Sequence, residues 1–278
     1  MPELPEVETT RRGVAPLLES RILESFDVRD ARLRWPVVLP PTLAGQRLLG
    51  VERRGKYLLF RFETGTLIVH LGMSGSLRVL AVGAPRRKHD HLEFRFADGQ
   101  ALRFHDPRRF GSVHWHTGDP AEHWLLAPLG PEPLDASFDG SLLKRAARGR
   151  RVAVKSFIMD SHVVVGVGNI YANEALFLAG IRPTVAAGRV TLAAYQALAD
   201  AIRRTLHAAI EQGGTTLRDF VKEDGNPGYF SQSLNVYGRE GQPCRACGRA
   251  LQSLRIGQRA TVFCKHCQKS QCFSRPRW

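Results

Sequence analysis

Four cysteines near the end of the chain have the spacing of a metal site. Cys244 and Cys247 form one C-x2-C pair, and Cys264 and Cys267 form a second after sixteen intervening residues. Two pairs at this spacing are typical of a four-thiolate site for one structural Zn²⁺, in a module that folds only with its metal. Two disulfides are the alternative, and His266 could replace one cysteine as a ligand. Reduced cysteines would also indicate an intracellular protein.

The chain begins with a proline that could act as a nucleophile. Removal of Met1 would leave Pro2 as a secondary amine. A terminal amine has a pKa of about 8, against about 10.4 for lysine, so more of it is unprotonated near neutral pH. Such an amine can attack an electrophilic carbon, and Glu3 or Glu6 could relay a proton beside it. The simpler reading is that Pro2 only starts the chain; with Met1 retained its nitrogen is an inert amide.

Three further features are candidates for binding or catalysis. Lys56 precedes an apolar strand, where a solvated lysine is the simple alternative. Arg259 lies within the cysteine module and could be a clamp for phosphate. The glycine-rich segment 166–169 leads into a predicted helix whose free N–H groups could bind a phosphate, although a structural turn would have the same composition.

The charge balance favours nucleic acid as the partner. The chain has 40 Lys and Arg against 26 Asp and Glu, a net charge of +14, and a pI near 10.3. Residues 239–278 alone carry nine basic residues and one acidic residue. We find no apolar segment of about 18 residues and no signal-peptide core, so we expect a cytoplasmic protein without a membrane partner.

Helices and strands must position these candidate residues. The sequence of the first half of the chain predicts β-strands. Segments 57–62 and 66–70 flank a turn, and alternate apolar residues in 92–96 and 102–104 flank Asp98-Gly99. Closely spaced strands with turns between them indicate an antiparallel sandwich or barrel. We expect a short helix before them, from Val7 to about Arg12, because Gly13 and Pro16 should weaken its continuation.

The second half predicts helices. A proline-rich stretch, 129–133, is typical of a linker between domains. Beyond it we expect a helix from about Asn169 to Ala179, ended by Gly180. A second helix should begin after Thr191 as its N-cap and end at Gly213-Gly214.

Several separated motifs occur in one chain and in a recognisable order. Together they resemble the bacterial formamidopyrimidine-DNA glycosylases, over nearly the whole chain to about Lys269. The motifs are PELPEVETTRRG at 2–13, HLGMSGSL at 70–77, KHDH at 88–91, DPRRFG at 106–111, GVGNIYANEALFLAGI at 166–181 and the four cysteines.

This resemblance implies an α+β fold of several parts. The expected order is an N-terminal antiparallel β-sandwich with flanking helices (1–130), a helical helix-two-turn-helix domain (131–232), a four-cysteine zinc finger (233–269) and a basic tail (270–278). The polar loop 216–229 is then expected to be a mobile lid, with an ordinary surface loop as the alternative. The resemblance implies no role for the tail or its Cys272.

The resemblance also implies a chemistry. The family excises oxidised purines, chiefly 8-oxoguanine and formamidopyrimidines, from double-stranded DNA and then cuts the strand by β,δ-elimination. Pro2 matches the nucleophile that forms a Schiff base with the sugar, and Glu3 matches the acid/base residue. Lys56 and Arg259 match the proton donors of β- and δ-elimination. A bacterial monomer that is nucleoid-associated when bound to damaged DNA is expected.

Further positions match the family's DNA contacts. Three side chains, Met73, Arg108 and Phe110, match the group that fills the void left by the extruded base, although Met73 alone would suggest core packing. Arg151 stands where some members carry lysine. The other matching contacts are His89 and Asn169, and Arg108 again.

Three rival readings stay open at this point. A related endonuclease VIII-like enzyme would prefer oxidised pyrimidines. A non-catalytic architectural DNA-binding protein would need the basic finger but would have no use for Pro2, Glu3 or Lys56. An RNA-binding zinc ribbon would need an RNA-specific motif, and we find none in the sequence.

Overall fold

A computed structural model describes residues 2–213 and 234–270. Its contacts divide the chain into two compact units, with the division at Pro128 and Leu129. The first unit contains the strand-rich half, and the second contains the helices and the cysteine module. The predicted lid at 216–229 and the tail with Cys272 lie outside the described residues.

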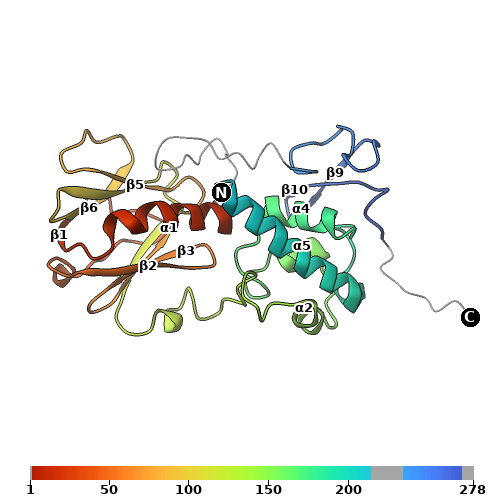
Figure 1. Ribbon diagram of the computed structural model, residues 1–278, viewed down its shortest axis with the longest axis horizontal. Helices are drawn as coiled ribbons and strands as arrows, with labels where there is room; N and C mark the ends of the chain where they lie inside the picture. Colours follow the sequence, from red (N-terminus) through yellow and green to blue (C-terminus); the bar gives the residue numbers. More distant parts are fainter. Residues whose placement is uncertain (1, 214–233, 271–278) are drawn as a thin grey trace, which may run out of the picture. The chain divides into compact units, whose positions relative to one another are not determined.

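The first unit contains two four-stranded antiparallel sheets (Figure 1). One has the order β1 (Leu23–Val28), β6 (Asp90–Phe96), β7 (Gln100–His105) and β5 (Ser76–Ala81). The other has the order β2 (Leu48–Arg54), β3 (Tyr57–Phe62), β4 (Thr66–His70) and β8 (Ser112–His116). The predicted antiparallel β-sandwich is therefore confirmed, as are the hairpins β3–β4 and β6–β7.

Alternating apolar residues hold this sandwich together. In the β6–β7 pair, Leu92 lies opposite Phe104 and Phe94 opposite Leu102. These side chains join residues of the second sheet, such as Phe60, in one buried cluster. Period-two alternation places one set of side chains on the inner face of each sheet, which is why these sequences form strands around a shared core.

Helix α1 (Leu4–Leu18) is longer than the sequence predicts. It begins before Val7 and continues through Gly13 and Pro16, so the predicted end at about Arg12 is wrong. The helix contacts β2 and β5, the edge strands of the two sheets, and Val14 and Leu18 are fully buried there. Burial of this second half outweighs the local preference of glycine and proline against helix.

The second unit is built from helices and one hairpin. Its elements are α2 (Gly140–Ala146), α3 (Val154–Ile158), α4 (Asn169–Leu178), α5 (Leu192–Glu211), β9 (Gln252–Ile256) and β10 (Arg259–Phe263). Short 3₁₀ turns occur at η1 (Pro41–Leu43) and η2 (Pro120–Glu122) in the first unit and at η3 (Ala187–Arg189) in the second. The two long helices start and end within about one residue of the predicted positions.

The proline-rich stretch at 129–133 is anchored in the second unit. Gly130 donates its N–H to the carbonyl of Ser161, and Val165 donates to that of Pro131. The chain therefore enters the helical unit through a hydrogen-bonded segment.

We predict that Thr191→Ala lowers the free energy of unfolding. The Ala194 N–H donates to Thr191 Oγ1 at 3.2 Å, at the start of α5. Loss of such a cap costs about 1 kcal/mol. Urea unfolding of the zinc-loaded protein measures this, with Thr184→Ala as the control because Thr184 is exposed. Equal stability of the two variants would contradict the capping role.

Candidate active site and metal centre

The start of α1 fixes the N-terminal residues in place. Pro2 is buried, and Glu3 and Glu6 are 2% and 1% exposed. Glu3 is the N-cap of the helix, and its backbone N–H donates to Glu6 Oε2 at 2.8 Å within a capping box. The two carboxylates that follow Pro2 are thus part of one helix terminus, where the helix dipole favours negative charge.

Lys56 lies in the tight turn between β2 and β3, after Gly55 with φ +56°. The ring of His70, at the end of β4, packs against Tyr57 with centroids 4.7 Å apart. Burial, with Lys56 and Arg34 nearby, lowers the pKa of His70 to about 4. His70 Nδ1 accepts the Gly72 N–H at 3.0 Å, so the neutral ring carries its proton on Nε2. His70 thus adds a neutral hydrogen-bond donor in the neighbourhood of the Lys56 cation.

Met73, Arg108 and Phe110 come from two adjacent loops. Met73 is half-buried, Arg108 is exposed and Phe110 is 44% exposed. The Arg108 guanidinium lies 5.1 Å from the centre of the Phe110 ring. A Cβ at Gly72 would lie 2.4 Å from Gly111 N, so the two loop backbones are in direct contact. The structure brings these three predicted residues together.

His89 adopts a left-handed backbone conformation, with φ +74°. Its ring lies 6.1 Å from those of both His91 and His105. Partial burial and the adjacent Lys88 lower the pKa of His89. His89 therefore lies in a cluster of three histidine rings on the first unit.

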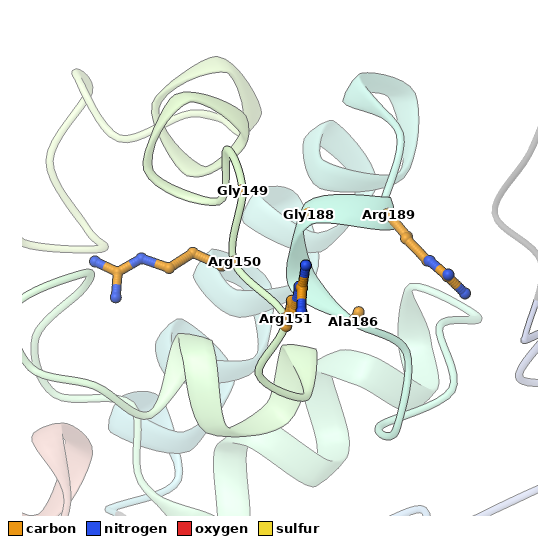
Figure 2. A pocket seen from close by; sticks show the side chains of 6 residues that line it. All are labelled: Gly149, Arg150, Arg151, Ala186, Gly188 and Arg189. Carbon is orange, nitrogen blue, oxygen red and sulfur yellow. The ribbon is translucent and has the colours of Figure 1, made fainter.

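Arg151 lines a basic hollow on the second unit. The hollow has a volume of about 590 Å³ and is lined by Gly149, Arg150, Arg151, Ala186, Gly188 and Arg189. Figure 2 shows Arg150 and Arg189 directed away from each other, with Arg151 between them. All three arginines are exposed. They spread positive charge over a surface and do not converge on one point. Such an arrangement suits the binding of a polyanion better than that of one small anion.

Arg259 begins β10, and the helices hold the neighbouring residues of that strand. Lys155 of α3 is 1% exposed, and its ammonium donates to the Ala260 carbonyl at 2.9 Å and to Thr261 Oγ1 at 2.7 Å. Asn169 Nδ2 donates to the same carbonyl at 3.1 Å. The exposed Arg259 thus extends from a strand that α3 and α4 anchor.

The four cysteines fit a zinc ion. Their sulfur atoms all lie within 4.8 Å of one another. Cys244 and Cys267 are 3.9 Å apart at Sγ, and Cys247 and Cys264 are 3.5 Å apart. Tetrahedral zinc with bonds of about 2.3 Å needs sulfur atoms about 3.8 Å apart, whereas a disulfide needs roughly 2.05 Å. The module therefore holds one structural zinc through four thiolates, and the two-disulfide alternative is wrong.

His266 has a different partner. It is exposed, and its Nδ1 lies 2.8 Å from the Arg249 guanidinium. The cluster of potential metal ligands consists of the cysteines alone among the described residues.

The candidate residues divide between the two units. The first carries Pro2, Glu3, Lys56, Met73, His89, Arg108 and Phe110, and the second carries Arg151, Asn169, Arg259 and the four cysteines. Sequence reasoning did not single out His70 or Lys155. His70 is the first residue of the HLGMSGSL motif, and this position in a motif could have indicated a functional role. The buried contacts of Lys155 depend on tertiary structure and leave no such signal in the sequence.

Within residues 2–213 and 234–270, no helix is both long and apolar enough to span a bilayer.

Three family models match successive parts of the chain. Residues 1–113 match the formamidopyrimidine-DNA glycosylase N-terminal domain, and residues 129–221 match the H2TH domain of the same glycosylase. Residues 241–269 match the zinc finger found in FPG and IleRS.

Whole-chain comparisons agree with these matches. Proteins named formamidopyrimidine-DNA glycosylase from Alkalilimnicola ehrlichii and Methylococcus capsulatus are each 61% identical, over 97% of this chain and 100% of theirs. The crystal structure of MutM (Fpg) from Thermus thermophilus is 40% identical with a TM-score of 0.86, over 96% of this chain and 98% of that one. A Lactococcus lactis Fpg mutant in complex with Fapy-dG-containing DNA is 35% identical with a TM-score of 0.89, over 96% and 100%. With the motifs and the thiolate cluster, these likenesses show that the chain belongs to the formamidopyrimidine-DNA glycosylase family.

Proposed function

We propose that this protein is a base-excision repair enzyme that removes oxidised purines from double-stranded DNA and then cuts the strand at the resulting abasic site. The observation that carries the proposal is the fixed start of α1, where the buried Pro2 directly precedes the Glu3–Glu6 capping box. A non-catalytic DNA-binding protein has no need for this arrangement. The similar Lactococcus lactis Fpg is bound to DNA that contains Fapy-dG, and this supports a purine lesion as the substrate here.

The first step is attack by Pro2 after Met1 has been removed. The nitrogen lone pair forms a bond to the sugar C1′, and the C1′–N bond to the damaged base breaks. The base leaves with that electron pair and takes up a proton. The amine then loses its proton, the C1′–O4′ bond breaks and O4′ takes up a proton, which gives an iminium ion at C1′. Glu3 is the residue proposed to move these protons.

The second stage cuts the DNA. The iminium makes the C2′ proton acidic, and its loss expels the 3′ phosphate by β-elimination. A further elimination expels the 5′ phosphate, and water then releases Pro2. Lys56 and Arg259 are the proposed proton donors for the two eliminations. Lys56 is placed by the turn beside His70, and Arg259 by the anchored strand β10.

The lesion must leave the helix before this chemistry. Extrusion costs a few kcal/mol of stacking. Met73 and Phe110 supply apolar surface to fill the void, and Arg108 can hydrogen-bond the unpaired base on the opposite strand. We assign DNA backbone contacts to His89, Arg151 and Asn169, and we expect the enzyme in the cytoplasm, on the nucleoid when bound to DNA.

We predict that borohydride traps a covalent complex between this protein and a duplex containing 8-oxoguanine opposite cytosine, provided that Pro2 is the first residue. A protein that retains Met1 should bind the duplex and give no complex, because its proline nitrogen is an amide. Gel electrophoresis after reduction measures both. Trapping on an oxidised pyrimidine alone would indicate the endonuclease VIII-like activity, and binding without trapping in either form would indicate an architectural protein.

We predict that Arg151→Ala weakens the salt dependence of DNA binding. Each lost phosphate contact lowers the slope of log K against log salt by about 0.9. Arg151→Lys should keep the slope because it keeps the charge. Arg204→Ala is the matched control, because it removes one exposed charge from the same unit. Equal slopes for both alanine variants would contradict the proposed contact.

We predict that removal of zinc abolishes specific DNA binding. Without metal, no bonds hold the four cysteine side chains together, and the module should unfold. A chelator titration followed by DNA-binding anisotropy measures this, and Cys247→Ser should reproduce the effect. Full affinity in the zinc-free protein would show that the finger is dispensable.

A further inference from the structure

Asp106 lies at the junction of the loops that carry the proposed void-filling residues. It follows β7 directly and begins the segment that contains Arg108 and Phe110. Its side chain is fully buried, at 0% exposure. A buried carboxylate loses its hydration and must be compensated by hydrogen bonds, so its partners reveal what it is holding.

Each oxygen of this carboxylate accepts hydrogen bonds from the loops. Oδ1 accepts the Ser74 hydroxyl at 2.6 Å and the Arg108 N–H at 3.3 Å. Oδ2 accepts the Gly111 N–H at 2.8 Å. Met73 precedes Ser74 directly, and Phe110 precedes Gly111. The three donors are thus the chain neighbours of Met73 and Phe110, together with the backbone of Arg108 itself.

The backbone of Asp106 reaches a third segment. Its N–H donates to the carbonyl of His89 at 3.1 Å, and its carbonyl lies 2.8 Å from His91 Nε2. His89 has the unfavourable φ of +74°, so a fixed partner on its carbonyl helps to hold that conformation.

Two glycines let the loops close around the carboxylate. A Cβ at Gly111 would lie 3.0 Å from Asp106 Oδ2 and 2.6 Å from the Phe104 ring. Gly72 has φ +66°, and a Cβ there would overlap the backbone of Phe110. The absence of side chains at these positions permits the short hydrogen bonds of Asp106.

We propose that Asp106 is a positioning residue that sets the void-filling side chains and His89 in place before DNA is bound. The proposal rests on the proposed function, because it assigns Asp106 a role through Met73, Arg108 and Phe110. Hydrogen bonds to a charged acceptor are shorter and stronger than neutral ones. A side chain that must enter the duplex as the base leaves loses less entropy on binding if its loop is already fixed.

The substitution Asp106→Asn tests the positioning role with little change in the size of the side chain. An amide nitrogen cannot accept a hydrogen bond, so either Gly111 N–H or the Ser74 and Arg108 pair would face a donor. We expect single-turnover excision of 8-oxoguanine to fall about tenfold, which is about 1.4 kcal/mol of transition-state stabilisation. Cleavage at a preformed abasic site should change by no more than about twofold, because no stacked base has to be extruded there.

A second measurement follows the opening of the base stack by the void-filling residues. 2-Aminopurine beside the lesion brightens when the stack opens, and the rise on binding should be smaller with Asp106→Asn than with the parent. Ser74→Ala removes one of the three donors to Asp106, together with the hydroxyl that accepts the Arg108 N–H at 3.2 Å, and it should shift excision in the same direction. It remains informative if Asp106→Asn fails to fold.

Ser112→Ala is the matched control for Ser74→Ala. Ser112 is a buried serine whose hydroxyl has no hydrogen-bond partner among the described residues, so its loss should leave excision unchanged. A folded Asp106→Asn protein that excises like the parent would overturn the proposal. Equal losses in excision and abasic cleavage would also overturn it. Failure of the proposed function would appear instead in the parent, as the absence of any trapped complex.

Discussion

The proposed chemistry of this protein depends on keeping the first residues of the chain in a fixed position. Chain termini usually fray, and a nucleophile at a terminus would then sample many positions. Here the terminus is the start of a helix whose Leu4 and Val7 are fully buried. The Glu6 carboxylate binds the Glu3 N–H and fixes the backbone one residue from Pro2. The length of α1, which continues through Pro16 to the sheet edges, anchors that start in the core.

The remaining candidate groups lie on loops, turns and strand ends within each of the two units. Lys56 lies in a two-residue hairpin, and Phe110 lies just before β8. Arg259 begins a strand that Lys155 and Asn169 hold from the helical unit. In each case a turn, a loop or a strand end presents the side chain, and a packed element beside it limits how far that segment moves. Proteins commonly carry their binding residues on loops that a rigid scaffold positions.

The sequence predicts much of this because the local signals are strong. The spacing of the cysteines is enough to predict a zinc site, and alternation in 92–96 is enough to predict a strand. The length of α1 is not predicted, because burial of Val14 and Leu18 is a tertiary effect that Gly13 and Pro16 conceal. The partners of Asp106 lie up to 32 residues away, so periodicity and local propensity give no indication of them.

Lys155 links the folding of the helices to that of the finger. Its buried ammonium is satisfied in part by Ala260 and Thr261 of β10, and Asn173 of α4 accepts the Val262 N–H of the same strand. If β10 detached, the Lys155 ammonium would lose both of these acceptors. The metal and the helical unit are therefore thermodynamically linked. Zinc affinity should contain a contribution from helix packing, and a damaged helix core should make the protein release its metal more easily.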